Sequence, residues 1–465
     1  MFDFYYFCSS LAQRVMLKKT DKILIVAVAL LLLFPVRAVR AQDAQLAGIG
    51  YSPYSLFGFG DLVRQGSGYS LSMGGIGIAD RNVRYINFIN PAAVTAREAK
   101  SFMMDFGLEN RNTVYQGNAA AAMGSEASGV HKSAHNTFNM HHIVVSLPIE
   151  SHSAFKAGIM PYSTVGYKFE AREQSDELLA EVGDIRYVRS GEGGIYQAFL
   201  GAGVTLWNRL SVGADVNYYF GQIDRSSNAE FINKASFRAI NSGWTYNVSC
   251  FGGKAGLQYT QPLTNALSTV LGLTYTFPAR LRGGEIRYAF GETGSATDTV
   301  TYERHSLENF NAPSEIGAGI TFRYADRWMF GFDYSQQDWS ATVTSAYPGV
   351  DFEAGIARNF RAGFEITPNR YDIRSGFFHA LRRLTYRAGV YHELSYMTLG
   401  GSRVASTGVT LGMGIPVFRY YNSINFGIEA GQRGTLKNDL IRERYFLFTL
   451  SFNLYDIWFI KSLYY

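Results

Sequence analysis

The chain has 465 residues, of which 15% are aromatic, 17% are charged and 48 are glycine. Its formal net charge is +5, and most of that surplus lies in residues 1–41, so the rest of the chain is close to neutral. Recognition of nucleic acid needs a clustered basic surplus, and the sequence therefore argues against DNA or RNA as a partner.

Residues 1–41 have the layout of a secretory signal peptide. Three lysines, at positions 18, 19 and 22, precede the apolar run "ILIVAVALLLLFPV", and a small-residue cleavage pattern ends at Ala41. Met16 is a more natural start than Met1, because it places these lysines at the N-terminus. A retained membrane anchor is the alternative, but the run is shorter than the roughly 20 residues of a transmembrane helix. After cleavage Cys250 is the only cysteine, which leaves no disulfide within the chain.

Residues 42–100 differ in composition from the remainder of the mature chain and are predicted to form a plug. They are rich in Gly, Ser and Asn, and they contain the stretch "MGGIGIADRN". A dinucleotide-binding loop needs an apolar strand before its glycines and a helix after them, and neither pattern is present. A periplasmic tail is the alternative, but a wide barrel encloses more space than its strand side chains fill. The predicted hatch residues are Gly74, Gly75 and Gly77 at tight bends, and Asn87, Asn90, Pro91 and Ala92 at turns before the first strand.

From residue 101 onward, period-2 alternation predicts β-strands. Between Leu210 and Phe220 the even positions read Leu, Val, Ala, Val, Tyr and Phe, whereas the odd positions are Ser, Gly, Asp, Asn and Tyr. Segments of this length suit tilted membrane-spanning strands, and an even number of strands places both termini in the periplasm. About fourteen strands are predicted, with twelve or sixteen as alternatives, near 101–112, 136–148, 154–171, 194–206, 210–222, 244–259, 267–279, 314–324, 328–341, 356–366, 383–396, 407–417, 423–433 and 443–454.

Two further features favour an all-β transmembrane antiparallel β-barrel over a soluble sandwich. Tight turns at 207–209, 325–327 and 419–422 alternate with long polar connections, as periplasmic turns alternate with external loops in such barrels. The long connections are 110–135, 173–193, 222–241 and 278–313. The polar face of the strands is also strongly charged, which a wet lumen tolerates better than a dry core. These charges form either a selectivity ring or, as we favour, ion pairs between wall and plug. The predicted lumen charges are Arg323, Asp333, Arg361, Glu365, Arg387, Glu393, Glu429 and Arg433.

The third predicted strand is interrupted. In "AFKAGIMPYSTVGYKF" the apolar alternation stops at Pro161 and resumes at Val165. Proline has no N–H for a ladder and belongs at strand edges or bulges. A gap near Pro161, Ser163 and Gly166 would let a hydrophobic solute leave sideways into the bilayer. A simple β-bulge without an opening is the alternative.

Little in the sequence predicts catalysis or metal binding. His131, His135, His141, His142 and His152 cluster, but adjacent residues on a strand point to opposite faces, so no metal site is expected. No GxSxG motif is present, and we expect neither an enzyme nor a cofactor. One connection, 367–382, is long where a short turn is expected, and its stretch "SGFFHALRR" is predicted to form a small periplasmic helix.

The mature chain resembles the FadL-type (fatty-acid transporter-like) outer-membrane barrels, in the divergent branch found in Bacteroidetes-like bacteria. The resemblance rests on "SPYSLFGFGDL", "SMGGIGIADRN", the triplet Asn90-Pro91-Ala92 and the closing "RERYFLFTLSFNLYDIWF". It implies a fourteen-stranded barrel at residues 101–465 with an N-terminal hatch and a kinked third strand. It further implies passive uptake of hydrophobic small molecules across the bacterial outer membrane, with hatch-gated access and lateral exit. Related barrels act instead as partners of the type IX secretion machinery, so a non-transporting scaffold is the alternative. The implied partners are outer-membrane lipids and either hydrophobic cargo or secretion-system proteins.

Overall fold

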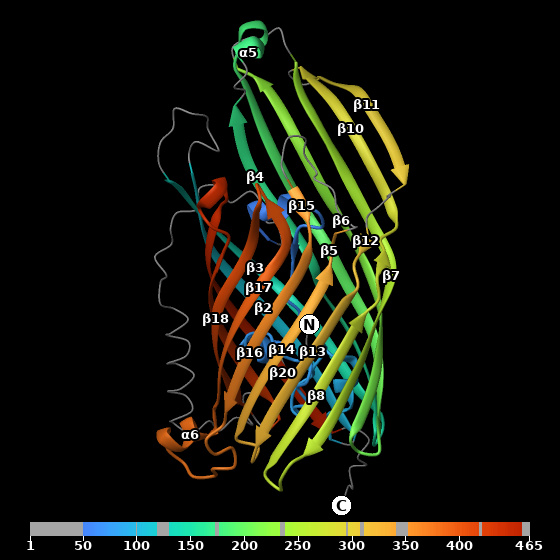
Figure 1. Ribbon diagram of the computed structural model, residues 1–465, viewed down its shortest axis with the longest axis vertical. Helices are drawn as coiled ribbons and strands as arrows, with labels where there is room; N and C mark the ends of the chain where they lie inside the picture. Colours follow the sequence, from blue (N-terminus) through green and yellow to red (C-terminus); the bar gives the residue numbers. More distant parts are fainter. Residues whose placement is uncertain are drawn as a thin grey trace, which may run out of the picture.

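The computed structural model describes residues 50–457, apart from residue 99 and residues 119–129, 173–175, 233–237, 294–295, 307–310, 341–351 and 418–420. The predicted signal peptide therefore lies outside the described residues. The wall is a fourteen-stranded antiparallel β-barrel, closed by the pairing of its last strand with its first (Figure 1). In chain order its strands are β2 (Ser101–Asn118), β3 (Val130–Glu150), β4 (Ser153–Arg172), β5 (Ile185–Leu206), β6 (Leu210–Phe231), β7 (Ala239–Pro262), β8 (Leu267–Thr276), β13 (Glu315–Tyr324), β14 (Trp328–Asp338), β16 (Ile356–Ile366), β17 (Thr385–Leu399), β18 (Ser402–Pro416), β19 (Ser423–Arg433) and β20 (Arg442–Ile457).

The predicted alternation is confirmed by the burial of the wall residues. Apolar side chains such as Leu200, Val216 and Leu271 face outward and are exposed, whereas polar side chains such as Asp215 and Gln258 face inward and are buried. The outward face thus forms the apolar belt of a membrane barrel.

Two of the three predicted tight turns are confirmed and have the geometry of type I′ turns. Trp207 and Asn208 have φ of 50° and 57°, and Ala325 and Asp326 have φ of 48° and 55°. Positive φ at both central residues matches the right-handed twist of the flanking strands, which is why this turn joins adjacent strands. The third predicted turn, 419–422, falls largely outside the described residues. These turns mark the lower end of the barrel in Figure 1.

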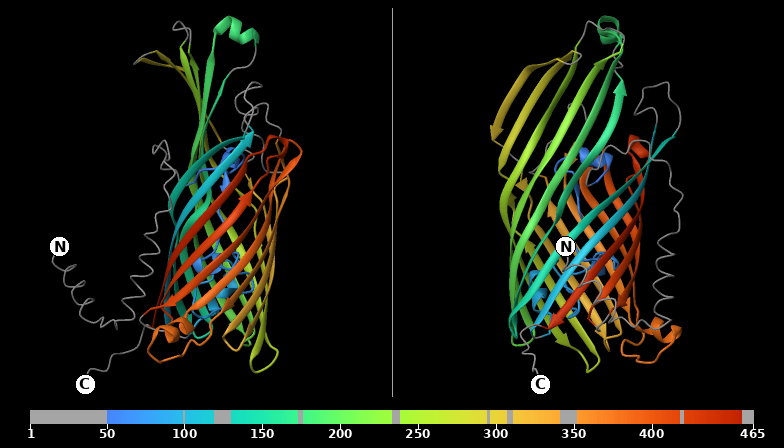
Figure 2. Two further views of the ribbon diagram at one scale, coloured as in Figure 1. Left: turned by 90° about the vertical axis from the view of Figure 1, so that its left-hand side faces the viewer. Right: turned by 180° about the vertical axis from the view of Figure 1, so that it is seen from behind.

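The long polar connections predicted at the upper end consist largely of strands. Strands β4 to β7 continue well above the rest of the wall, and the 278–313 connection contains a further hairpin, β10 (Gly283–Thr293) and β11 (Ala296–Ser306) (Figure 2). Strand β10 pairs with the upper part of β7. The raised parts of β4 to β7 and the β10–β11 hairpin together form what we call the tall sheet. Above the apolar belt these connections are long and polar overall, so they read as loops in the sequence although the backbone ladder continues. The short pieces at this end are α5 (Asp176–Val182), β9 (Ala279–Arg280), β12 (Asn311–Ala312), β15 (Phe352–Ala354) and η3 (Lys437–Asp439).

The wall is interrupted between β3 and β4. Their ladder runs from Glu150–Ser153 at the lower end to Ile143–Ile159 and includes no pair above that point. Above it, the described part of β3 pairs only with β2. Strand β4 pairs there with β1 (Asp61–Leu62), a two-residue strand from the N-terminal part of the chain.

The predicted small helix in the 367–382 connection is confirmed as α6 (Phe377–Arg383), at the lower end of the barrel. Three other helical pieces lie in the N-terminal part of the chain: η1 (Pro53–Leu56), α3 (Gly68–Leu71) and η2 (Pro91–Thr95). Among the described residues, no helix has the length and apolar character needed to cross a bilayer.

Candidate functional site: the filled lumen and its cavity

Residues 50–98, which we call the N-terminal segment, lie inside the barrel (Figure 2). Its short helical pieces begin where the sequence supplies caps. Asn90 accepts a hydrogen bond from the Ala92 N–H at 3.0 Å, and Pro91 takes the first helical position, where its missing N–H costs nothing. Ser52 and Ser67 cap η1 and α3 in the same way. Local capping therefore shapes a segment whose only described strand, β1, pairs with the wall rather than with the segment itself.

The predicted hatch residues form a compact turn region against the wall. Gly74 and Gly75 have φ of 74° and 82°, a backbone region that favours glycine. The Gly74 N–H donates to Thr410 Oγ1 at 2.8 Å, and the Gly77 N–H donates to Asp333 at 2.6 Å.

The asparagines close this region from within. The Asn87 side-chain amide donates to the Gly77 carbonyl at 2.6 Å, and that of Asn90 donates to the Ile78 carbonyl at 2.7 Å. Ala92 is fully buried. Hydrogen bonds thus join the turn at Gly77 and Ile78 to Asn87 and Asn90, whereas Gly74 lies against β16 and β17 and Pro91 lies against β6 and β7. The role of these residues as a moving hatch stays a prediction.

The eight predicted lumen charges also face inward. Six of them contact the N-terminal segment: Arg323 with Asp80, Asp333 with the Gly77 and Ile78 amides, Arg387 with the Tyr85 hydroxyl, Glu393 and Glu429 with Arg64, and Arg433 with Asp61. The other two bind within the wall, Arg361 to Glu393 at 3.0 Å and Glu365 to Arg387 at 3.0 Å. This arrangement matches the ion-pair interpretation rather than a ring of charges open to ions.

Three charged residues of the N-terminal segment, Asp61, Arg64 and Asp80, were missed as site residues. Arg64 lies at the centre, with its Nε 3.1 Å from Glu393, its Nη1 2.8 Å from Glu429 and its guanidinium 3.8 Å from the centroid of the Tyr391 ring. The signal in the sequence was a charge in a segment predicted to be enclosed, because a buried charge needs a partner.

The pKa values of these charges reflect burial and pairing. Burial lowers the pKa of the Arg64 guanidinium, but Glu393 and Glu429 outweigh it and hold that pKa well above its ordinary value. Burial raises the pKa of the Asp80 carboxyl, and the neighbouring Arg323 opposes the rise. Arg64 is therefore a permanent cation whose charge is balanced by the wall.

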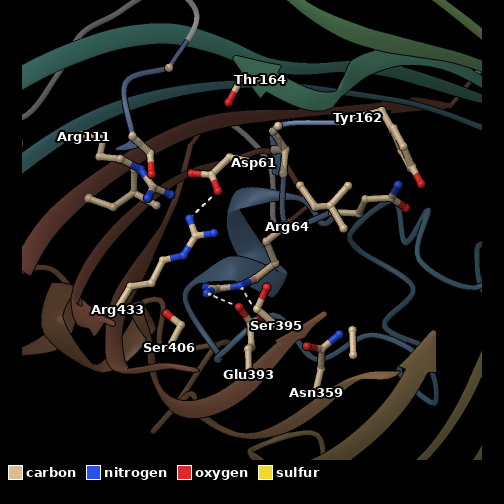
Figure 3. A pocket seen from close by; sticks show the side chains of 18 of the residues that line it. Asp61, Arg64, Arg111, Tyr162, Thr164, Asn359, Glu393, Ser395, Ser406 and Arg433 are labelled. Carbon is tan, nitrogen blue, oxygen red and sulfur yellow. Dashed lines mark hydrogen bonds and ion pairs between the residues drawn. The ribbon is translucent and has the colours of Figure 1, made fainter. Parts of the chain in front are cut away.

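Ion-paired residues of the N-terminal segment and the wall line a cavity of about 240 Å³ (Figure 3). Charged and apolar side chains both line it. Arg64 and Glu393 meet on one side, and Asp61 and Arg433 meet on another, with Arg111 close by. Tyr162 and Thr164 of β4 also line it, so the cavity reaches the inner side of the interruption between β3 and β4.

The predicted lateral-opening residues lie at this interruption. The β4–β5 ladder shifts register between Pro161 and Ser163, which is the β-bulge that proline favours. Ser163 pairs with Leu62 of β1, and the Gly166 carbonyl accepts from the Ser52 N–H at 2.8 Å. The N-terminal segment therefore covers the edge of β4 where β3 leaves it.

The expectation that His141 and His142 point to opposite faces was wrong. Gly107 of β2 pairs with His142 and Leu108 pairs with Met140, so His141 is an extra residue at a β-bulge. Both side chains are buried, and His142 Nε2 lies 2.6 Å from Asp105 Oδ1. No group of three or more His, Cys, Asp or Glu side chains suited to a metal ion occurs among the described residues.

A family model described as BamG matches residues 16–465. The chain belongs to the BamG family. No curated protein matches the chain.

Solved structures show what this BamG-family fold is similar to. The Pseudomonas putida toluene transporter TodX aligns over 86% of this chain and 100% of its own, with a TM-score of 0.54 and 16% identity. A Pseudomonas aeruginosa FadL homologue aligns over 85% and 99%, with a TM-score of 0.51 and 13% identity. The Ralstonia pickettii toluene transporter TbuX aligns over 84% and 98%, with a TM-score of 0.50 and 15% identity. The fold is that of a FadL-type outer-membrane β-barrel, as the sequence resemblance predicted.

Proposed function

We propose that the protein is an outer-membrane channel for passive uptake of small hydrophobic molecules, gated by a plug formed from residues 42–100. The observation that carries this proposal is the interruption between β3 and β4, which lies beside the lumen cavity and is covered by β1. In this proposal the signal peptide is removed, both termini are periplasmic, and the tall sheet stands outside the cell. The partners are outer-membrane lipids and a hydrophobic cargo.

The gate is the contact between β1 and β4. It consists of two residue pairs, Asp61–Thr164 and Leu62–Ser163, with the Val63 N–H donating to the Tyr162 carbonyl at 3.0 Å. Withdrawal of β1 would join the cavity to the gap above Ile143–Ile159 and give a solute a lateral path into the bilayer. The similarity to the toluene transporters TodX and TbuX supports a hydrocarbon as the first cargo to test.

A disulfide across the gate tests this proposal. Leu62 and Ser163 are directly opposite, in the antiparallel spacing that a disulfide spans, so Leu62→Cys combined with Ser163→Cys locks β1 onto β4 when oxidised. We expect oxidation to abolish protein-dependent entry of radiolabelled toluene into cells, and reduction to restore it.

The matched control is a lock in the uninterrupted wall. Val204 and Val212 are opposite each other in β5 and β6, and the pair Val204→Cys with Val212→Cys should leave toluene entry unchanged. Equal entry through the oxidised and reduced forms of the Leu62–Ser163 lock would rule out this gate. Absence of any protein-dependent entry would rule out the channel itself.

A partner barrel of a secretion system is the second candidate, and the charged lining of the cavity favours it. Apolar solutes gain little from a chamber in which Arg64, Glu393, Asp61 and Arg433 meet. In this alternative the N-terminal segment is static, and the β10–β11 hairpin, which exposes Val300 and Tyr302, contacts secretion-system proteins.

Removal of the hairpin separates the two candidates. Strands β8 and β13 pair directly, and β9 pairs with β12 at the base of the hairpin, so a short linker can replace Gly283–Ser306 without opening the wall. A scaffold should lose secretion, measured as the amount of protein released into the medium, while toluene entry stays unchanged. If the protein is a channel, removal of the hairpin should change neither secretion nor toluene entry.

A further inference from the structure

The connection between β16 and β17, residues 367–384, exposes a group of large apolar side chains at the lower end of the barrel. Ile373 is 87% exposed, Phe378 76%, Tyr371 61% and Phe377 54%. Scattered exposed apolar residues need no explanation, but four within eight positions form a patch that marks an interaction site.

Hydrogen bonds within the connection fix the backbone that carries the patch. Asp372 is buried beneath it and accepts hydrogen bonds from Arg374 Nε at 3.0 Å and from His379 Nδ1 at 2.9 Å. The hydrogen bond from Arg374, and to a smaller extent that from His379, holds the pKa of the Asp372 carboxyl well below its usual range. The Asn369 N–H donates to the Arg382 carbonyl at 2.8 Å, which ties the start of the connection to the end of α6. The apolar side chains therefore project from a fixed frame.

The charge of the connection is strongly positive. It contains Arg370, Arg374, Arg382 and Arg383, and its only carboxylate is Asp372. Asp372 is engaged by Arg374 and His379, so it does not neutralise the two arginines at the end of α6. Aromatic side chains next to arginines are typical of segments that lie in a membrane interface.

The patch lies beside the foot of the wall, since α6 lies there, lateral to the strands, in Figures 1 and 2. The Tyr386 hydroxyl of β17 donates to the Leu381 carbonyl at 3.1 Å. Trp328 of β14 and Phe364 of β16 pack with their ring centroids 5.5 Å apart. Such aromatic pairs are typical of the girdle that marks the edge of the membrane in outer-membrane barrels.

We propose that residues 370–383 form a lipid-binding foot that lies in the headgroup region of the periplasmic leaflet and binds the phosphate groups of anionic phospholipids. Phe377, Phe378 and Ile373 enter the boundary between headgroups and acyl chains, and Arg382 and Arg383 pair with phosphates. The proposal needs the barrel to be in a membrane but is independent of what the lumen carries.

The depth of Phe378 in the membrane tests the proposal. A nitroxide attached to Phe378→Cys, in vesicles of phosphatidylethanolamine and phosphatidylglycerol, should collide readily with oxygen and rarely with a water-soluble nickel chelate. The matched control is Asn265→Cys in the exposed β7–β8 turn at the same end, where the nickel chelate should dominate. Equal access of the nickel chelate to both labels would overturn the proposal. It would also be overturned if the label at position 378 became shielded from the chelate only after a periplasmic protein was added.

A second measurement tests the headgroup chemistry. Arg382→Gln with Arg383→Gln should reduce the preference for spin-labelled phosphatidylglycerol over phosphatidylcholine by about fivefold per arginine. The change in electrophoretic mobility on heating reports whether each variant still forms a barrel. An unchanged lipid preference in a folded double variant would overturn the assignment of these arginines to phosphate.

Discussion

Replacement of Arg64 by methionine is expected to lower the free energy of unfolding by about 3–5 kcal/mol, the usual cost of removing one member of a buried ion pair. The side chain bridges Glu393 and Glu429, at 3.1 and 2.8 Å, and packs on the Tyr391 ring. Methionine keeps much of the packing volume but leaves both carboxylates with fewer partners. The measurement is equilibrium unfolding in urea of the protein in lipid vesicles, followed by tryptophan fluorescence.

The control for Arg64→Met is the same substitution at an exposed pair. Arg287 lies 2.6 Å from Glu285 on the tall sheet and is largely exposed, so Arg287→Met should change the free energy of unfolding by less than about 1 kcal/mol. Similar losses for the two variants would contradict the view that Arg64 anchors the N-terminal segment. Arg64→Met should also raise ion conductance across planar bilayers, because the released segment no longer fills the lumen, and Arg287→Met should not.

The wall was predictable because lipid imposes a strong pattern on the sequence. Where one face meets the bilayer and the other a polar lumen, residues such as Leu210–Phe220 alternate strictly, and all fourteen strands follow from that alternation. The β10–β11 hairpin was read as part of an external loop because the 278–313 connection is long and polar, although Ile286, Tyr288 and Phe290 of β10 alternate with polar or small residues. The same reason explains why the upper parts of β5, β6 and β7 read as loops in the sequence.

The site was predictable in kind but not in its pairings. Charges on the inward face had to find partners, and the sequence identified them, from Arg323 to Arg433. Their partners Asp61, Arg64 and Asp80 lie hundreds of residues away, and only the folded chain brings them together. The bulge that turns His141 inward depends likewise on the register between β2 and β3, which a single strand's pattern does not contain.

The N-terminal segment is seated so closely on the wall that one added methyl group should displace it. A Cβ at Gly389 of β17 would lie 2.2 Å from both the Gly74 nitrogen and the Met73 carbonyl carbon. These are backbone atoms, so they cannot rotate away as a flexible side chain would. Gly389→Ala is therefore expected to cost about 1–3 kcal/mol, the usual range for overpacking.

The displacement has a local signature that distinguishes it from general unfolding. When the turn at Met73–Gly77 moves off the wall, the Gly74–Thr410 and Gly77–Asp333 hydrogen bonds break, and the amides of these two glycines should exchange with deuterium faster. Gly284→Ala is the matched control, because no atom lies within 4 Å of its added Cβ, and it should leave this exchange unchanged. Faster exchange at Gly74 and Gly77, with the β17–β18 ladder still protected, would mean that the segment separates from an intact wall. That separation is the physical requirement for a gate, whereas loss of protection in both places at once would make segment and wall a single cooperative unit, as the static scaffold requires.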